Sequence, residues 1–137
     1  MKGLYIHIPF CRSKCQYCDF YSVTDKESSL LDSYMYAVMA HVKEAGPLAP
    51  NHKVDTIYFG GGTPSFFGAD GIATILTCIR RNFDVDMNAE ITFEANPDSI
   101  SDPLLKRLHA EGFNRVSLGI QSDDDEILSK LGRPHTY

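Results

Sequence analysis

Residues 4–18, LYIHIPFCRSKCQYC, decide how the chain is organised. The first five alternate in a β-branched and aromatic run, which predicts a strand over residues 4–8, and Pro9 ends it. Three thiols follow at once, Cys11, Cys15 and Cys18, in the spacing C-x3-C-x2-C. In α/β proteins, ligands bind at the carboxyl ends of the strands. The stretch therefore predicts an α/β fold with a thiol-rich site at the end of its first strand.

The rest of the chain repeats this strand-then-helix order. Further strands are predicted over residues 54–59, 90–95 and 115–120, and helices over 27–45, 72–83, 102–110 and from the acidic run 123–126 to 131. Such alternation favours parallel strands joined by right-handed crossovers, with helices covering them. The predicted fold class is therefore α/β, a partial (β/α) barrel of about four units within a single domain, 1–137. An uncovered parallel edge is unfavourable, so we expect a fragment of a longer protein or an assembly that covers the fourth strand.

Several noticeable side chains are predicted to be structural. Ser28 and Ser29 are expected to cap the first helix. The side chains predicted to pack in the core are His7, Tyr34, Met35, Tyr36, Met39 and Cys78. The acidic run 123–126 lacks the spacing and glycine of a calcium loop and is expected to begin a helix.

Composition narrows the class of protein. The net charge is -5, which leaves no general basic face for a nucleic-acid backbone. No apolar run approaches the roughly 20 residues that span a bilayer, and the amino terminus lacks the features of a signal peptide. We therefore expect a globular cytoplasmic protein with no nucleic acid among its partners and no transmembrane segment.

The three clustered thiols admit more than one chemistry. Thiolates hold zinc or iron–sulfur clusters, and three thiolates on a four-iron cluster leave one iron open for a substrate or cofactor. A zinc site would need a fourth ligand such as His7. A disulfide would leave one of the three thiols unpaired. Three ordinary buried cysteines are a further alternative. The close, ordered spacing favours the cluster.

Other candidate ligand groups follow the later predicted strands. Gly60, Gly61, Gly62 and Thr63 follow the second strand, where backbone N–H groups could face a polar ligand. Neither a dinucleotide fingerprint nor a P-loop fits their spacing. Glu94 ends the third strand on the same predicted rim.

Four segments, 4–20, 58–65, 91–98 and 115–133, together resemble the radical S-adenosylmethionine (SAM) proteins of the oxygen-independent coproporphyrinogen III oxidase-like family. The resemblance implies that the chain is the amino-terminal part of a radical SAM core domain, with the barrel incomplete. It implies a [4Fe-4S] cluster on Cys11, Cys15 and Cys18, with SAM bound at the open iron. The residues it implies around SAM, or around a second SAM, are Tyr5, Tyr17, Gly61, Gly62, Thr63, Glu94, Gln121 and Arg133. No catalytic residue is assigned.

Phe20 separates two branches of that family. The oxidase has a cysteine two places after the third cluster thiol, whereas the heme chaperone branch has the Cys-Asp-Phe found here at 18–20. The resemblance thus implies a protein that binds heme or porphyrin and passes heme to acceptor proteins, with an electron donor to the cluster. The alternative is coproporphyrinogen III oxidation to protoporphyrinogen IX. No heme ligand is assigned.

Overall fold

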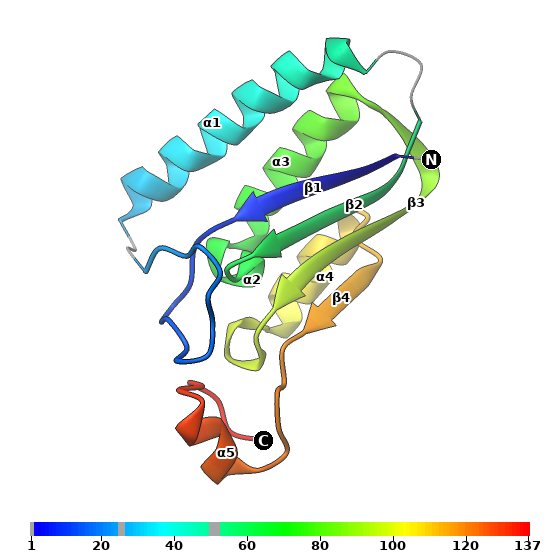
Figure 1. Cartoon of the computed structure of the whole chain (residues 1–137). Helices are drawn as coiled ribbons and strands as arrows, with labels where there is room; N and C mark the ends of the chain where they lie inside the picture. Colours follow the sequence, from blue (N-terminus) through cyan, green and yellow to red (C-terminus); the bar gives the residue numbers. More distant parts are fainter. Residues whose placement is uncertain (1, 25–26, 50–52) are drawn as a thin grey trace.

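Four parallel strands lie side by side in chain order and form the centre of the molecule (Figure 1). The computed structural model describes residues 2–24, 27–49 and 53–137. The strands are β1 (Lys2–Ile8), β2 (Lys53–Gly61), β3 (Asp84–Ala95) and β4 (Arg115–Leu118). Every neighbouring pair is parallel, which confirms the predicted α/β class.

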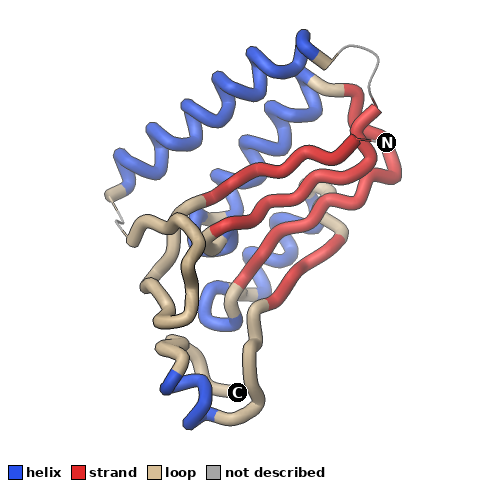
Figure 2. Tube along the Cα trace, in the orientation of Figure 1, coloured by secondary structure: helices blue, strands red, loops and turns tan. Residues whose placement is uncertain are grey.

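Helices alternate with the strands, and all but the last helix cover one face of the sheet (Figure 2). They are α1 (Ser28–Ala45), α2 (Pro64–Phe67), α3 (Ala69–Asn82), α4 (Asp102–Ala110) and α5 (Asp125–Lys130), with 3-10 turns η1 (Gly46–Leu48) and η2 (Pro97–Ser99). The α5 helix lies beyond the carboxyl ends of the strands (Figure 1). None of the described helices is long and apolar enough to cross a membrane.

The core lies between the sheet and the helices. On α3, Ile72, Ile75 and Ile79 are fully buried at helical spacing. They belong to the same apolar cluster as Phe59 and Phe93, which point from β2 and β3 towards the helices. This single packed layer holds the carboxyl ends of the strands in fixed register.

The opposite face of the sheet is polar. The strand register places Tyr5, Tyr58, Thr92 and Arg115 in one row across the four strands. Because successive strand residues point to opposite faces, this row faces away from the helix layer. Within the described part of the chain, no helix covers this face (Figure 2).

Some local predictions were wrong. Ser28 and Ser29 lie inside α1, because the cap position with extended backbone angles falls on Glu27. Tyr36 is 65% exposed, since its side of α1 faces away from the sheet, whereas Tyr34 packs against the core as predicted.

The other differences concern element bounds. Short helix α2 was not predicted, and it begins at Pro64, a favoured first helical residue. Strand β3 begins at Asp84 rather than Glu90 because an irregular pairing with β2 extends it. Strand β4 ends at Leu118, because the next residues turn out of the sheet. Cys78 is buried as predicted.

The buried face of α4 provides a test of the core. Leu108 is 0% exposed, so Leu108→Ala should lower the free energy of unfolding by about 2–5 kcal/mol because it leaves a cavity. Lys106→Ala on the exposed side of the same helix should change it by less than about 0.5 kcal/mol. Urea unfolding followed by circular dichroism measures both, and equal effects would contradict this packing.

Candidate functional site

Four segments that are distant in sequence meet at the carboxyl ends of the strands. They are the cysteine loop after β1, the glycine turn after β2, the end of β3 and the segment after β4 (Figure 1). Together they surround a hollow of about 230 Å³. The predicted site residues that line it are Cys11, Cys15, Tyr17, Cys18, Gly61, Gly62, Glu94, Gln121 and Arg133.

Two predicted site residues lie outside this hollow. Tyr5 lines a separate groove of about 310 Å³ between β1 and α1, and its hydroxyl is 3.1 Å from Nδ1 of His7. Thr63 is 4% exposed and lies behind Cys11. His7 itself is partly buried, with its ring against Gly61.

Backbone hydrogen bonds fix the cysteine loop against the glycine turn. The Gly62 N–H donates to the Ile8 carbonyl at 2.7 Å, and the Thr63 N–H donates to the Phe10 carbonyl at 2.8 Å. A Cβ on Gly62 would lie 2.7–2.9 Å from backbone atoms of residues 8–10, so only glycine fits there. The loop closes on itself where the Val23 N–H donates to the Pro9 carbonyl at 2.7 Å.

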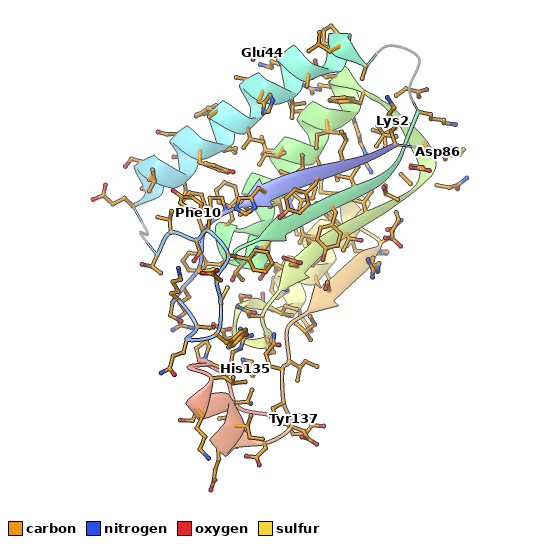
Figure 3. All side chains as sticks on the ribbon, in the orientation of Figure 1. Lys2, Phe10, Glu44, Asp86, His135 and Tyr137 are labelled. Atoms are coloured by element: carbon orange, nitrogen blue, oxygen red, sulfur yellow. The ribbon has the colours of Figure 1, made fainter. Side chains whose placement is uncertain are left out.

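Phe10 anchors the start of the same loop in the core. Phe10 is labelled in Figure 3 and is 1% exposed. Its ring packs edge-on against Tyr34 of α1 at 5.2 Å and stacks on Phe67 of α2 at 5.5 Å. Phe10 directly precedes Cys11. The backbone that leads into Cys11 is therefore fixed by the core, whereas the loop beyond Cys11 is more exposed.

The N–H donors of the glycine turn are all engaged within the protein. Those of Gly62 and Thr63 form the bonds just described, and the Gly61 N–H donates to Oε2 of Glu94 at 3.0 Å. The expectation that these N–H groups face a ligand was therefore wrong for residues 61–63. Close packing of the turn against β1 requires these bonds, because a buried N–H group needs a partner.

Glu94 is held on two sides. Besides the Gly61 N–H, its Oε1 accepts a hydrogen bond of 2.7 Å from the Tyr58 hydroxyl. The Tyr58 ring stacks on that of Tyr5, with centroids 6.2 Å apart. Tyr58 was not predicted as a site residue, because an aromatic residue within a strand pattern indicates only core packing. Each carboxylate oxygen of Glu94 accepts one of these bonds and keeps a second lone pair, and Glu94 lines the hollow.

The three thiols are partly exposed and line the hollow. Burial raises the pKa of Cys11 and the Thr63 hydrogen bond opposes this, while the neighbouring Cys18 and Cys15 raise it further. Among the described residues, no three His, Cys, Asp or Glu side chains are grouped as ligands of a single ion. A four-iron cluster is held by cysteine thiolates, and three thiols of one loop that line the same hollow supply that donor set.

Arg133 returns from the far end of the chain to this site. Its Nη2 donates to the Gly119 carbonyl at 2.6 Å and to Oδ1 of Asn96 at 2.7 Å. Its Nη1 lies 3.6 Å from Sγ of Cys15 and 3.4 Å from the Tyr17 hydroxyl. None of these partners is a carboxylate, and its buried Nε has no partner among the described residues. The guanidinium is thus suited to an anionic group in the hollow.

Asn96 was missed by the sequence analysis. Its Oδ1 accepts from Arg133, and its Nδ2 donates to Oγ1 of Thr63 at 3.2 Å. The only signal in the sequence is its position two residues after Glu94 at the end of β3. An Asn-Pro pair at that position indicates a turn equally well.

Gln121 follows β4 in an unusual backbone conformation. Its φ is 72°, the only positive value among the described non-glycine residues. The space beside Gly119 is filled by the side chains of Gln121, Asn96 and Arg133, so a Cβ on Gly119 would lie 2.7 Å from Nε2 of Gln121. The strained backbone brings the Gln121 side chain to the wall of the hollow.

The sequence was compared with family models, and the radical SAM superfamily model matches residues 5–137. The chain belongs to the radical SAM superfamily. Among curated proteins it is 40% identical over 137 residues to the heme chaperone HemW of Haemophilus influenzae, and 39% identical over 133 residues to that of Escherichia coli. It is 34% identical over 131 residues to the oxygen-independent coproporphyrinogen III oxidase of Salmonella typhimurium.

A solved radical SAM structure has the same fold. It is coproporphyrinogen III oxidase (HemN) from Escherichia coli, with a TM-score of 0.90 and 32% identity over 97% of this chain and 31% of that chain. This match confirms the predicted partial barrel. The alignments cover 96–97% of this chain but 36%, 35% and 29% of the three curated relatives, so it spans about a third of their length.

The close approach at Gly62 predicts a cost for added volume. Gly62→Ala should lower the free energy of unfolding by about 1–3 kcal/mol, because the backbone of residues 8–10 must move. In the control variant Gly3→Ala, the added Cβ comes close only to the exposed Thr56 hydroxyl. This variant should change the free energy of unfolding by less than about 0.5 kcal/mol. Urea unfolding of both variants checks this, and a neutral Gly62→Ala would refute the close approach.

Proposed function

We propose that Cys11, Cys15 and Cys18 ligate a [4Fe-4S] cluster and that SAM binds beside it. The observation that carries this proposal is the convergence of the three thiols with Glu94 and Arg133 on one hollow. The superfamily match supports it, because radical SAM proteins bind both groups. We further propose that residues 1–137 are the amino-terminal part of a radical SAM core.

The chain offers complementary groups for each polar part of SAM. Arg133 suits the carboxylate, because its Nη1 makes only long contacts, 3.6 Å to Sγ of Cys15 and 3.4 Å to the Tyr17 hydroxyl, and a charged donor forms a strong hydrogen bond with a carboxylate. Glu94 and the carbonyl oxygens of Gly61 and Gly62 suit the amino and hydroxyl donors. Tyr17 and Gln121 line the hollow beside these groups. Tyr5 and Thr63 lie outside the hollow, where Tyr5 stacks on Tyr58 and Thr63 donates to Cys11.

The role of the cofactor pair follows from radical SAM chemistry. When bound, the reduced cluster supplies the electron that cleaves SAM. The residues of this chain bind and orient the two groups, and Phe10 and the glycine turn keep the thiol loop in place. An electron donor is therefore a proposed partner.

For the whole protein we propose a heme chaperone that binds heme or porphyrin and delivers heme to acceptor proteins in the cytoplasm. The support is the similarity to proteins named heme chaperone HemW, together with Phe20 at the position that distinguishes the two branches. The alternative, coproporphyrinogen III oxidation, is favoured by the similarity to HemN. The negative net charge gives no support for a nucleic-acid partner.

Iron analysis tests the cluster. Anaerobically reconstituted protein should carry about four irons per chain. Cys15→Ser should lose most of them, because one thiolate ligand is removed. Cys78→Ser alters a buried thiol of α3 away from the hollow and should keep them. Colourless wild-type protein with one zinc would contradict the proposal.

Heme titration separates the two whole-protein functions. The chaperone function predicts a stoichiometric heme complex of the full-length protein, seen as a shifted Soret band, and heme transfer to an acceptor protein. The oxidase function predicts protoporphyrin formation from coproporphyrinogen III in an anaerobic assay with SAM. Absence of heme binding would end the chaperone proposal.

A further inference from the structure

A line of hydrogen bonds connects two of the three thiols through side chains outside the loop. It runs from Arg133 Nη2 to Asn96 Oδ1 at 2.7 Å, from Asn96 Nδ2 to Thr63 Oγ1 at 3.2 Å, and from Thr63 Oγ1 to Cys11 Sγ at 3.5 Å. From the same guanidinium, Nη1 lies 3.6 Å from Cys15 Sγ. One connected network therefore ends on two sulfurs.

The direction of each bond is determined by chemistry. A guanidinium only donates, so the Asn96 atom that faces Arg133 must be the amide oxygen. The Asn96 amide nitrogen then faces Thr63, and because that nitrogen also only donates, the Thr63 oxygen must accept. The single hydroxyl proton of Thr63 is left to point at Cys11. Arg133 thus sets the orientation of Asn96, and Asn96 sets that of Thr63.

We infer that Asn96 is a positioning residue, which holds the Thr63 hydroxyl as a donor to Cys11 so that the network raises the reduction potential of the cluster. This inference rests on the proposed function. Hydrogen bonds to the sulfurs of an iron–sulfur cluster are among the factors that set its potential. Such donors favour the reduced state, because it carries one more negative charge. Second-shell partners of this kind also orient the ligands themselves.

The burial of these residues suits this role. Thr63 is 4% exposed, so its hydroxyl, the donor to Cys11, is shielded from water. A hydrogen bond is electrostatically stronger in the protein interior than in water. The Thr63 N–H is fixed on the Phe10 carbonyl, which holds the hydroxyl near the thiol. Thr92 is a matched comparison, because it is 1% exposed but its hydroxyl donates to Glu90, away from the hollow.

The test is the midpoint potential of the reconstituted cluster, measured by following its EPR signal as the ambient potential is lowered. Thr63→Val removes the donor but keeps the shape of the side chain, and it should shift the midpoint to a more negative value. Thr63→Ser keeps the hydroxyl and should restore the wild-type midpoint. Thr92→Val is the buried control and should leave it unchanged.

The role of Asn96 is tested with Asn96→Asp, which has nearly the same shape. A carboxylate accepts the Thr63 proton and withdraws it from Cys11, so the midpoint should become more negative. The added charge acts in the same direction on its own. We therefore expect a smaller shift from Asn96→Asp in the Thr63→Val background than in the wild type, since that background lacks the hydroxyl proton.

The outcomes separate this inference from the proposed function. A wild-type protein without iron and sulfide would overturn both. A wild-type cluster whose midpoint is unchanged in Thr63→Val, or shifted equally by Thr63→Val and Thr92→Val, overturns the inference alone. If Thr63→Val holds no cluster, the Asn96→Asp variant decides, and a wild-type midpoint in that variant refutes the role of Asn96. Equal Asn96→Asp shifts in the two backgrounds refute it as well.

Discussion

Two backbone hydrogen bonds join the carboxyl ends of β1 and β2, and the candidate site depends on them. They run from the Gly62 N–H to the Ile8 carbonyl and from the Thr63 N–H to the Phe10 carbonyl. The approach is so close that position 62 has no room for a Cβ. Because the thiol loop begins at this contact, its first cysteine has a fixed position relative to the sheet. The glycines thus serve mainly to bring two strand ends together.

That contact determines what the turn can offer a ligand. The N–H groups of residues 61–63 are bonded inside the protein, so the turn is not an anion-binding nest. Positive charge comes instead from Arg133, which enters from the segment after β4. Its nearest acceptors are neutral or thiol groups, and its charge remains available to thiolates or to a bound carboxylate. The acidic side of the site is Glu94, held by Tyr58 and Gly61.

Much of this arrangement could be predicted from the sequence, because it depends on local pattern. Alternation of strand and helix signals predicted the parallel sheet, and the thiol spacing placed a ligand-bearing loop after the first strand. Parallel strands end at one edge, so Glu94 and the glycine turn could be placed near the thiols without coordinates. The element bounds and the Ser28 and Ser29 caps were less predictable, because the packing of neighbouring elements decides which residue ends a helix or strand.

The sequence by itself determined the α/β class, the three thiols and most of the residues that line the hollow. Only the tertiary structure decided how those residues are used, because hydrogen-bond direction depends on which atoms meet. Arg133 lies 118 positions from Cys15, and nothing local indicates their contact. Asn96 has no motif that distinguishes it from a turn residue, yet its orientation fixes that of Thr63. Long-range partners assign such roles, and they exist only once the chain has folded.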